Sequence, residues 1–234
     1  SADGFLALIS NNGTQLLSST FFGSSAYDQA YFVRTDRNNY PHIYGQTKAS
    51  GSTLIYNAQY NIPNSGQFVA KFKPNLDSVV WSTVFGTGDN RVNISPSGFA
   101  VDICNRVYCS GWGRVFKYMS SSIGINTLGT TNMQTTSNAY MDTTDGQDFY
   151  IMSLSSDAST LDYATFFGEY TTSPYSGCDH VDGGTSRFDK YSNLYQTVCA
   201  SCQGSQGFPT TVNCWSDSNR SANCNMASLK FSIH

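Results

Sequence analysis

The stretch that decides the fold reads QFVAKFKPN (67–75), VVWSTVFGTG (79–88), SGFAVDICN (97–105) and RVYCSGWG (106–113). Apolar and polar residues alternate in each piece, which is the pattern of a half-buried β-strand. The pieces end at turn signals such as Pro74-Asn75 and Gly86-Thr87-Gly88. We therefore expect four strands here that form one antiparallel meander.

This unit recurs along the chain. Its first strand, FVAKF at 68–72, has counterparts in FLALI (5–9), YIMSL (150–154) and ASLKF (227–231). Its second strand, WSTVFG at 81–86, returns as SSTFFG (18–23) and YATFFG (163–168). A fixed core with variable insertions indicates a repeat architecture. Four antiparallel strands per repeat predict the blades of a β-propeller.

The repeats divide the chain into three copies and a partial one. Their limits are 1–66, 67–147, 148–225 and 226–234. The first two copies carry long uncharged insertions between strands, and the third carries a cysteine-rich one. Three copies are few for a closed ring. We therefore expect an all-β arc of a larger propeller, completed by a partner or by further chain, and we expect the sequence to be a piece of something longer.

The composition supports an all-β fold and excludes some partners. Charged residues make up 12% and aromatic residues 14% of the 234 residues, and the net charge is −3. Few charges together with many Tyr, Phe, Ser and Thr fit strands better than helices. No basic stripe indicates nucleic acid binding. No apolar run is long enough for a membrane span.

The cysteines favour disulfides. Five of the seven cysteines lie in the last third of the chain. Cys199-Ala-Ser-Cys202 has the spacing of a zinc knuckle or a redox pair. However, a zinc site usually has a second close pair or histidine partners, and a redox pair usually opens a helix. We therefore expect structural disulfides among Cys199, Cys202, Cys214 and Cys224, and hence an oxidising compartment.

Three acids occupy equivalent positions in the copies: Asp36, Asp102 and Asp189. Repetition favours a structural role, in which a side-chain oxygen caps the turn that follows. Clustered oxygens in turns also suit calcium, so a structural calcium ion is the open alternative; otherwise no cofactor and no other metal is expected. Carboxylates for glycoside hydrolysis would occur at one place only.

The histidines give little indication of catalysis. His180-Val181-Asp182, with Ser186 nearby, contains the residue types of a catalytic triad. A triad also needs a nucleophile on a tight elbow, and no such motif is present. We expect this segment to lead into a strand, and we expect His42 to occupy a core or rim position.

Several motifs resemble a known family. AVDICNRVYCSGWG, TDGQDFYIMSL, HVDGGTSRFDKYSNLYQTVCASC and CNMASLKF are similar to the terminal β-propeller (SBBP-like) repeats of large Bacteroidetes surface proteins. The resemblance implies export across the outer membrane by type 9 secretion. It also implies a cell-surface or extracellular location and a role in gliding motility, adhesion or polymer contact. It supplies no catalytic residues.

The expected function is that of a non-catalytic structural or binding module of such a surface protein, not an enzyme. Expected partners are other segments of a larger surface assembly and polysaccharide. The alternative is a propeller-type enzyme or lectin acting on extracellular polysaccharide. Aromatic residues in the insertions would provide the contacts. These are Tyr56, Tyr60, Tyr118, Tyr140 and Trp215.

The resemblance also implies O-glycosylation. Proteins of this kind carry sugars at Asp-Ser or Asp-Thr followed by a small or apolar residue or by Thr. Ser78 in Asp77-Ser78-Val79 and Thr143 in Asp142-Thr143-Thr144 match that pattern. Both are expected in turns or loops, where a sugar fits.

Overall fold

The computed structural model describes residues 2–113, 129–171, 177–181 and 186–233. Regular structure in these residues consists of strands, apart from the short 3₁₀ helix η1 (Cys202–Gly204). The predicted all-β fold is therefore confirmed. None of the helical structure in this part of the chain has the length and apolar character needed to span a membrane.

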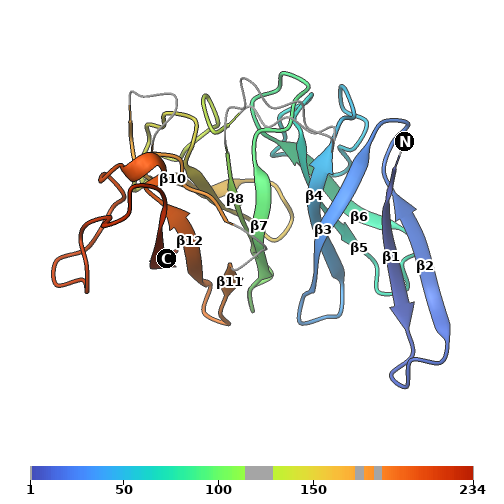
Figure 1. The fold of residues 1–234 in the computed structure, drawn as a ribbon. Helices are drawn as coiled ribbons and strands as arrows, with labels where there is room; N and C mark the ends of the chain where they lie inside the picture. The colour runs from blue at the N-terminus through green and yellow to red at the C-terminus, as the bar shows by residue number, and fades with distance from the viewer. Residues whose placement is uncertain (1, 114–128, 172–176, 182–185, 234) are drawn as a thin grey trace.

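The described residues form four antiparallel sheets, which contain β1–β2, β3–β6, β7–β10 and β11–β13. Figure 1 shows the sheets in chain order across the molecule, from β1–β2 (blue) at one end to β11–β13 (orange to red) at the other. The strands are β1 (Gly4–Ile9), β2 (Leu16–Phe22), β3 (Asp28–Thr35), β4 (Pro41–Thr47), β5 (Gln67–Phe72), β6 (Val79–Phe85), β7 (Ser95–Val101), β8 (Val107–Trp112), β9 (Phe149–Leu154), β10 (Leu161–Phe167), β11 (Arg187–Phe188), β12 (Asn193–Ala200) and β13 (Asn225–Ser232).

The prediction that 67–113 forms one meander is wrong. β5 and β6 complete the sheet that β3 and β4 begin, whereas β7 and β8 begin the next sheet. The chain therefore crosses between sheets through the short connection 86–94. The longer connection 48–66 joins β4 to β5, which pair directly. The β3–β6, β7–β10 and β11–β13 sheets thus each combine the second half of one sequence copy with the first half of the next, whereas the β1–β2 sheet contains the first half of the first copy alone.

The central strands of the two inner sheets, β4, β5, β8 and β9, are buried on both faces. In β9, Tyr150 and Met152 pack between their own sheet and the β3–β6 sheet. The intervening residues Phe149 and Ile151 pack in the cluster shared with the β11–β13 sheet. Successive side chains of a strand point to opposite faces, so one apolar strand contributes to two cores.

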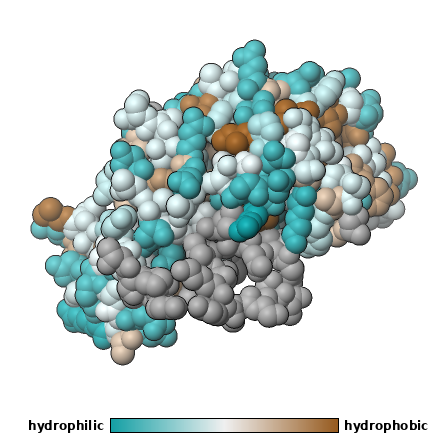
Figure 2. All heavy atoms as spheres, turned by 90° about the horizontal axis from the view of Figure 1, so that it is seen from above, coloured by the Kyte–Doolittle hydropathy of each residue, from teal (hydrophilic) through white to brown (hydrophobic). Residues whose placement is uncertain are grey.

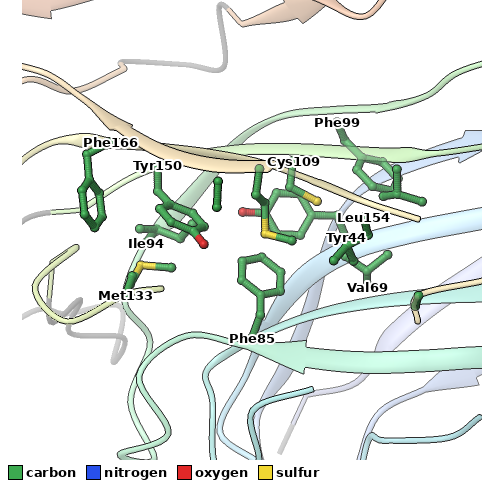
Figure 3. Packing of buried hydrophobic residues seen from close by; sticks show 14 of the residues in the cluster. Tyr44, Val69, Phe85, Ile94, Phe99, Cys109, Met133, Tyr150, Leu154 and Phe166 are labelled. Atoms are coloured by element: carbon green, nitrogen blue, oxygen red, sulfur yellow. The ribbon is translucent and has the colours of Figure 1, made fainter. Parts of the chain in front are cut away.

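The largest core cluster lies between the β3–β6 and β7–β10 sheets. Figure 3 shows Tyr44, Val69 and Phe85 of the first sheet on one side of it, with Tyr150 and Leu154 of the second sheet opposite. All five side chains are buried. Burying a large apolar side chain stabilises a fold by roughly 1.5–3 kcal/mol. Seen from above in Figure 2, by contrast, hydrophilic and intermediate side chains predominate, and apolar ones form separate groups.

A repeated hydrogen bond holds each connection that runs from one sheet to the next. The residue after a glycine at the end of one strand donates its backbone N–H to a side-chain oxygen near the start of the following sheet. At the second connection, a Cβ on Gly86 would lie 2.6 Å from Asn93 Oδ1, which leaves room for glycine alone. The donor and acceptor residues are Ser24 with Asp28, Thr87 with Asn93, and Glu169 with Asp179.

Asp148 is a buried carboxyl group beside the third of these connections. Its side chain is 0% exposed, and Oδ1 has no hydrogen-bond partner. Oδ2 accepts a hydrogen bond from the hydroxyl of Thr144. Burial raises the pKa of Asp148 to about 7, and the neighbouring carboxylate of Asp145 adds to the increase, although the Thr144 hydrogen bond opposes it.

Asp148→Asn should therefore flatten the pH dependence of stability. The pKa of Asp148 is higher in the folded protein than in the unfolded chain, so the folded state binds this proton more tightly. The resulting stabilisation of the fold is at its full value below the unfolded pKa of about 3.9. That contribution is lost as the pH rises through about 7. Each unit of pKa difference is worth about 1.4 kcal/mol. Relative to wild type, the variant should gain stability between pH 4 and pH 8.

Urea unfolding at pH 4, 5, 6, 7 and 8 measures this effect. Asp142→Asn, which removes an exposed carboxylate from the segment that precedes Asp148 between β8 and β9, is the matched control. Equal pH profiles for wild type and Asp148→Asn would show that Asp148 does not titrate as its environment indicates.

Candidate functional site

A groove near the C-terminal end of the chain is lined by five aromatic side chains, two of which are exposed. Its volume is about 720 Å³. The residues 206–219 form one wall, and β13 with the end of β10 forms the other. We call it the aromatic groove; its aromatic lining residues are Tyr140, Phe167, Phe208, Trp215 and Phe231.

Phe167 is the centre of the aromatic floor. Its ring centroid lies 5.8 Å from that of Tyr140, 5.5 Å from that of Phe208 and 6.0 Å from that of Phe231. Edge and tilted contacts of this kind hold aromatic rings in fixed orientations. Trp215 is different, because it is fully exposed and has no ring contact with the floor among the described residues. The groove therefore combines a fixed apolar floor with one ring that stands free in solvent.

Amide hydrogen bonds hold the wall of the groove. Asn219 N–H donates to Gln206 Oε1 at 2.9 Å, and Gln206 Nε2 donates to the carbonyl of Asn219 at 2.7 Å. Asn219 Nδ2 also donates to the carbonyl of Ser201 at 2.9 Å, which ties the wall to the end of β12. A wall without helix or strand is thus ordered by side-chain amides.

A disulfide closes the same insertion. Cys202 and Cys224 are bonded, which confirms one pairing among the four predicted cysteines. The expectation that all four cysteines are bonded among themselves is wrong for Cys199 and Cys214, which form no disulfide within the described residues. Cys199 is paired in the sheet with Met226, and Cys214 closes a turn onto Thr211, so different elements hold the two residues. Closing a loop of 22 residues stabilises the fold by roughly 3 kcal/mol.

The polar lining is suited to binding and offers little for hydrolysis. Of the described residues around the groove, Asp217 is the one carboxylate and Lys230 the one cation. Glycoside hydrolysis needs two carboxyl groups on either side of the bond that is cleaved. Open aromatic faces with serine, threonine and asparagine beside them suit contact with a chain that has apolar faces and many hydroxyl groups.

The groove brings together two of the five predicted contact aromatics, Tyr140 and Trp215. Tyr56 is 53% exposed but lies elsewhere, where its backbone pairs with Ser82. Tyr60 packs against the largest core cluster, so its ring is not presented to solvent as a contact residue would be. Tyr118 lies outside the described residues.

Sequence reasoning missed the floor of the groove. Phe167 and Phe231 belong to repeated strand motifs, which predict strands but do not indicate a groove. Phe208 stands next to Pro209 in an irregular insertion, where no periodicity indicates a direction. The pairing of β12 with β13 places Phe231, and its ring then meets Phe167 of β10, which also contacts Phe208.

The repeated aspartates have the predicted structural role. Asp102 Oδ1 accepts the backbone N–H groups of Cys104 and Arg106, both at 2.8 Å. Asp36 and Asp189 cap their turns in the same way. The capping prediction is confirmed at all three sites. The hydrogen bonds to Asp36, together with the Lys71 ammonium 2.9 Å away, outweigh its burial and lower its pKa.

The histidine predictions have separate outcomes. His42 is fully buried, with its ring centroid 5.7 Å from that of Trp81, so the expected core position is confirmed. Burial lowers its pKa to about 4. In the second segment, Ser186 Oγ is buried and has no hydrogen-bond partner, so it is not oriented by a base. Asp182 lies outside the described residues.

Two further predictions concern modification and metals. Thr143 is exposed, and Ser78 is half-buried with its hydroxyl 2.6 Å from Asp77 Oδ1; O-glycosylation of both stays a prediction. Within the described residues, ligand atoms gather closely enough for one ion at Cys178, His180 and Cys202. No comparable group of carboxylates is found in that part of the chain, which leaves the calcium alternative without support.

Comparison with known protein families and with curated proteins finds no match for this chain.

Proposed function

We propose that this chain is a non-catalytic structural and binding module, built as an arc of a β-propeller in a larger bacterial surface protein. The assignment to surface proteins exported by type 9 secretion rests on the sequence resemblance. The disulfide supports an oxidising, extracellular location. The partners proposed are other segments of the surface assembly and an extracellular polymer.

The order and packing of the sheets support the propeller arrangement. Each sheet pairs its strands in sequence order, as in β3-β4-β5-β6 and β7-β8-β9-β10. The first strands of neighbouring sheets lie near one another, because β7 contacts both β3 and β11. Radial repetition of sheets around a shared axis produces this pattern.

The observation that carries the proposal is a pair of exposed phenylalanine side chains at positions that are buried in the neighbouring sheets. Phe5 and Phe21 are partners in the β1–β2 register, have ring centroids 5.3 Å apart, and are 54% and 72% exposed. The same positions in the next two sheets face the preceding sheet and are at most 3% exposed. Those pairs are Phe68 with Val84 and Tyr150 with Phe166.

The β1–β2 sheet also lacks neighbours on one edge. β5 pairs with β4 and β9 pairs with β8, but no described strand pairs with the outer edge of β1. A two-stranded sheet with an open edge and an apolar face has low stability alone. A preceding propeller sheet from another segment of the surface protein would complete both the edge and the face.

Phe21→Ser tests whether another sheet covers β1–β2, because its effect on stability should differ between the isolated chain and the intact surface protein. In the isolated chain the substitution should change the free energy of unfolding by less than about 0.5 kcal/mol, because Phe21 is exposed. In the intact surface protein it should cost about 2–4 kcal/mol, as for a buried position. Urea unfolding with intrinsic fluorescence measures both values.

Val84→Ser is the matched control, since Val84 occupies the equivalent buried position. It should destabilise the protein in both contexts. If Phe21→Ser changes the free energy of unfolding of the intact surface protein by less than about 0.5 kcal/mol, the proposal that another sheet covers β1–β2 is wrong.

The aromatic groove supports polymer contact as the binding role. Trp215 and Tyr140 are exposed and line one cavity, and hot spots of binding are enriched in Trp and Tyr. The lectin alternative from the sequence shares this site. The enzyme alternative has less support, because glycoside hydrolysis needs two carboxyl groups and the described lining contains one.

Trp215→Ala and Tyr140→Ala should each lower the affinity for the extracellular polymer by at least about 1 kcal/mol, or roughly fivefold. Trp215→Ala should leave the melting temperature nearly unchanged because the ring is fully exposed. Co-sedimentation with purified surface polysaccharide measures the affinity.

Tyr191→Ala, at an exposed tyrosine outside the groove, is the control and should bind as wild type does. Loss of binding in the Tyr191 variant, or unchanged binding in both groove variants, would refute the groove as the contact surface. Turnover of the polymer by the wild type would favour the enzyme alternative.

A further inference from the structure

A thiol and imidazole cluster lies where the groove insertion leaves β12. One ligand atom each from Cys178, His180 and Cys202 lie within 4.8 Å of one another. Cys202 Sγ is 3.8 Å from His180 Nδ1. Because Cys224 is bonded to Cys202, a third cysteine sulfur is directly adjacent to this group. Three cysteines and one histidine therefore meet at one point.

The backbone holds the ligand-bearing segments in place. His180 N–H donates to the carbonyl of Cys199, and Cys199 N–H donates to the carbonyl of His180, both at 3.0 Å. Gly177 N–H donates to the carbonyl of Cys202 at 2.9 Å. The segment 177–180 thus runs alongside the end of β12, independently of the disulfide.

The alternation of an extended segment puts the ligands on one side. Cys178 and His180 are two residues apart, so they share a side, and Asp179 points to the other. The Asp179 carboxylate accepts the N–H groups of Glu169 at 2.7 Å and Ser201 at 2.9 Å. It therefore fixes the segment against its neighbours while Cys178 and His180 remain directed at Cys202.

We propose that Cys178, His180, Cys202 and Cys224 form a zinc site when the disulfide is reduced. A dithiol reductant supplies two electrons and two protons, breaks the Cys202–Cys224 bond and becomes a disulfide itself. Zn²⁺ then binds three thiolates and one imidazole nitrogen, and the thiol protons pass to solvent. The insertion is thus closed by a covalent bond in one redox state and by a metal ion in the other.

The chemistry of the ligand set selects zinc. Three thiolates and one imidazole make the closed, four-coordinate Cys₃His set of structural zinc sites. Soft thiolates disfavour magnesium and calcium, which take oxygen ligands. Cys178 and Cys202 are buried, so a bound ion is shielded from water and competing ligands.

The site differs from the sequence hypothesis of a knuckle formed by Cys199 and Cys202. Cys199 is outside the group of converging ligand atoms, and Cys178 with His180 supplies the second half instead. The signal available in the sequence was the Cys178-Asp-His180 motif, whose histidine lies 22 residues before Cys202.

The test compares the oxidised and reduced wild-type chain. The oxidised protein should bind no zinc at micromolar concentration, and the protein reduced anaerobically should bind one equivalent. Atomic emission after gel filtration gives the stoichiometry. Cobalt substitution of the reduced protein should give thiolate-to-cobalt charge-transfer bands and the visible bands of a tetrahedral site.

Cys178→Ser and His180→Ala identify the ligands. Each should lower the zinc affinity of the reduced protein by more than about 100-fold, the upper range for loss of an outer-shell partner. Cys214→Ser, in the same insertion but outside the cluster, should bind zinc as wild type does. Circular dichroism and formation of the Cys202–Cys224 disulfide check that each variant folds.

Two results would overturn the proposal: reduced wild type that binds no zinc, or zinc binding that survives both Cys178→Ser and His180→Ala. If a variant does not fold, the zinc stoichiometry and cobalt spectrum of reduced wild type decide alone. An octahedral cobalt spectrum without thiolate bands would also overturn it.

Discussion

The structure depends on burying both faces of its inner sheets between neighbouring sheets. Several strands of the β3–β6 and β7–β10 sheets carry consecutive apolar residues. The side chains of such a strand pack into two core clusters, one on each face of its sheet. A single sheet of this composition could not cover both faces, so stability arises from stacking. The β1–β2 sheet has one covered face, and the pair Phe5 and Phe21 on its other face is exposed.

The strands could be predicted from the sequence because alternation and turn residues are local signals. Their pairing could not, because pairing depends on contacts between distant residues. The short connection at 86–94 suggested a hairpin, but its repeated hydrogen bond, Thr87 N–H to Asn93 Oδ1, carries the chain to the next sheet. Conversely, the long segment at 48–66 looked like an insertion between units and proved to join two paired strands.

The proposed binding and metal sites lie where regular structure ends. The sequence predicted Tyr140 and Trp215 as contact residues because they are aromatic residues in polar insertions. It could not identify Phe167 and Phe231 as their neighbours, since both fit the repeated strand pattern. Similarly, backbone pairing of residue 180 with residue 199 and of residue 177 with residue 202 brings Cys178 and His180 to Cys202, and neither pairing is a local sequence signal. The cross-link at Cys202 and Cys224 closes the same insertion that carries Trp215, so the redox state of the cluster and the shape of the groove are physically connected.

Native-state hydrogen exchange tests the stacking account most directly. Amides of β8 and β9, whose sheet is covered on both faces, should exchange only through global unfolding. Amides of β1 and β2 should exchange much faster through local opening, because their two-stranded sheet is covered on one face and no described strand pairs with either of its edges. Protection of β1 and β2 equal to that of β8 and β9 would contradict the account.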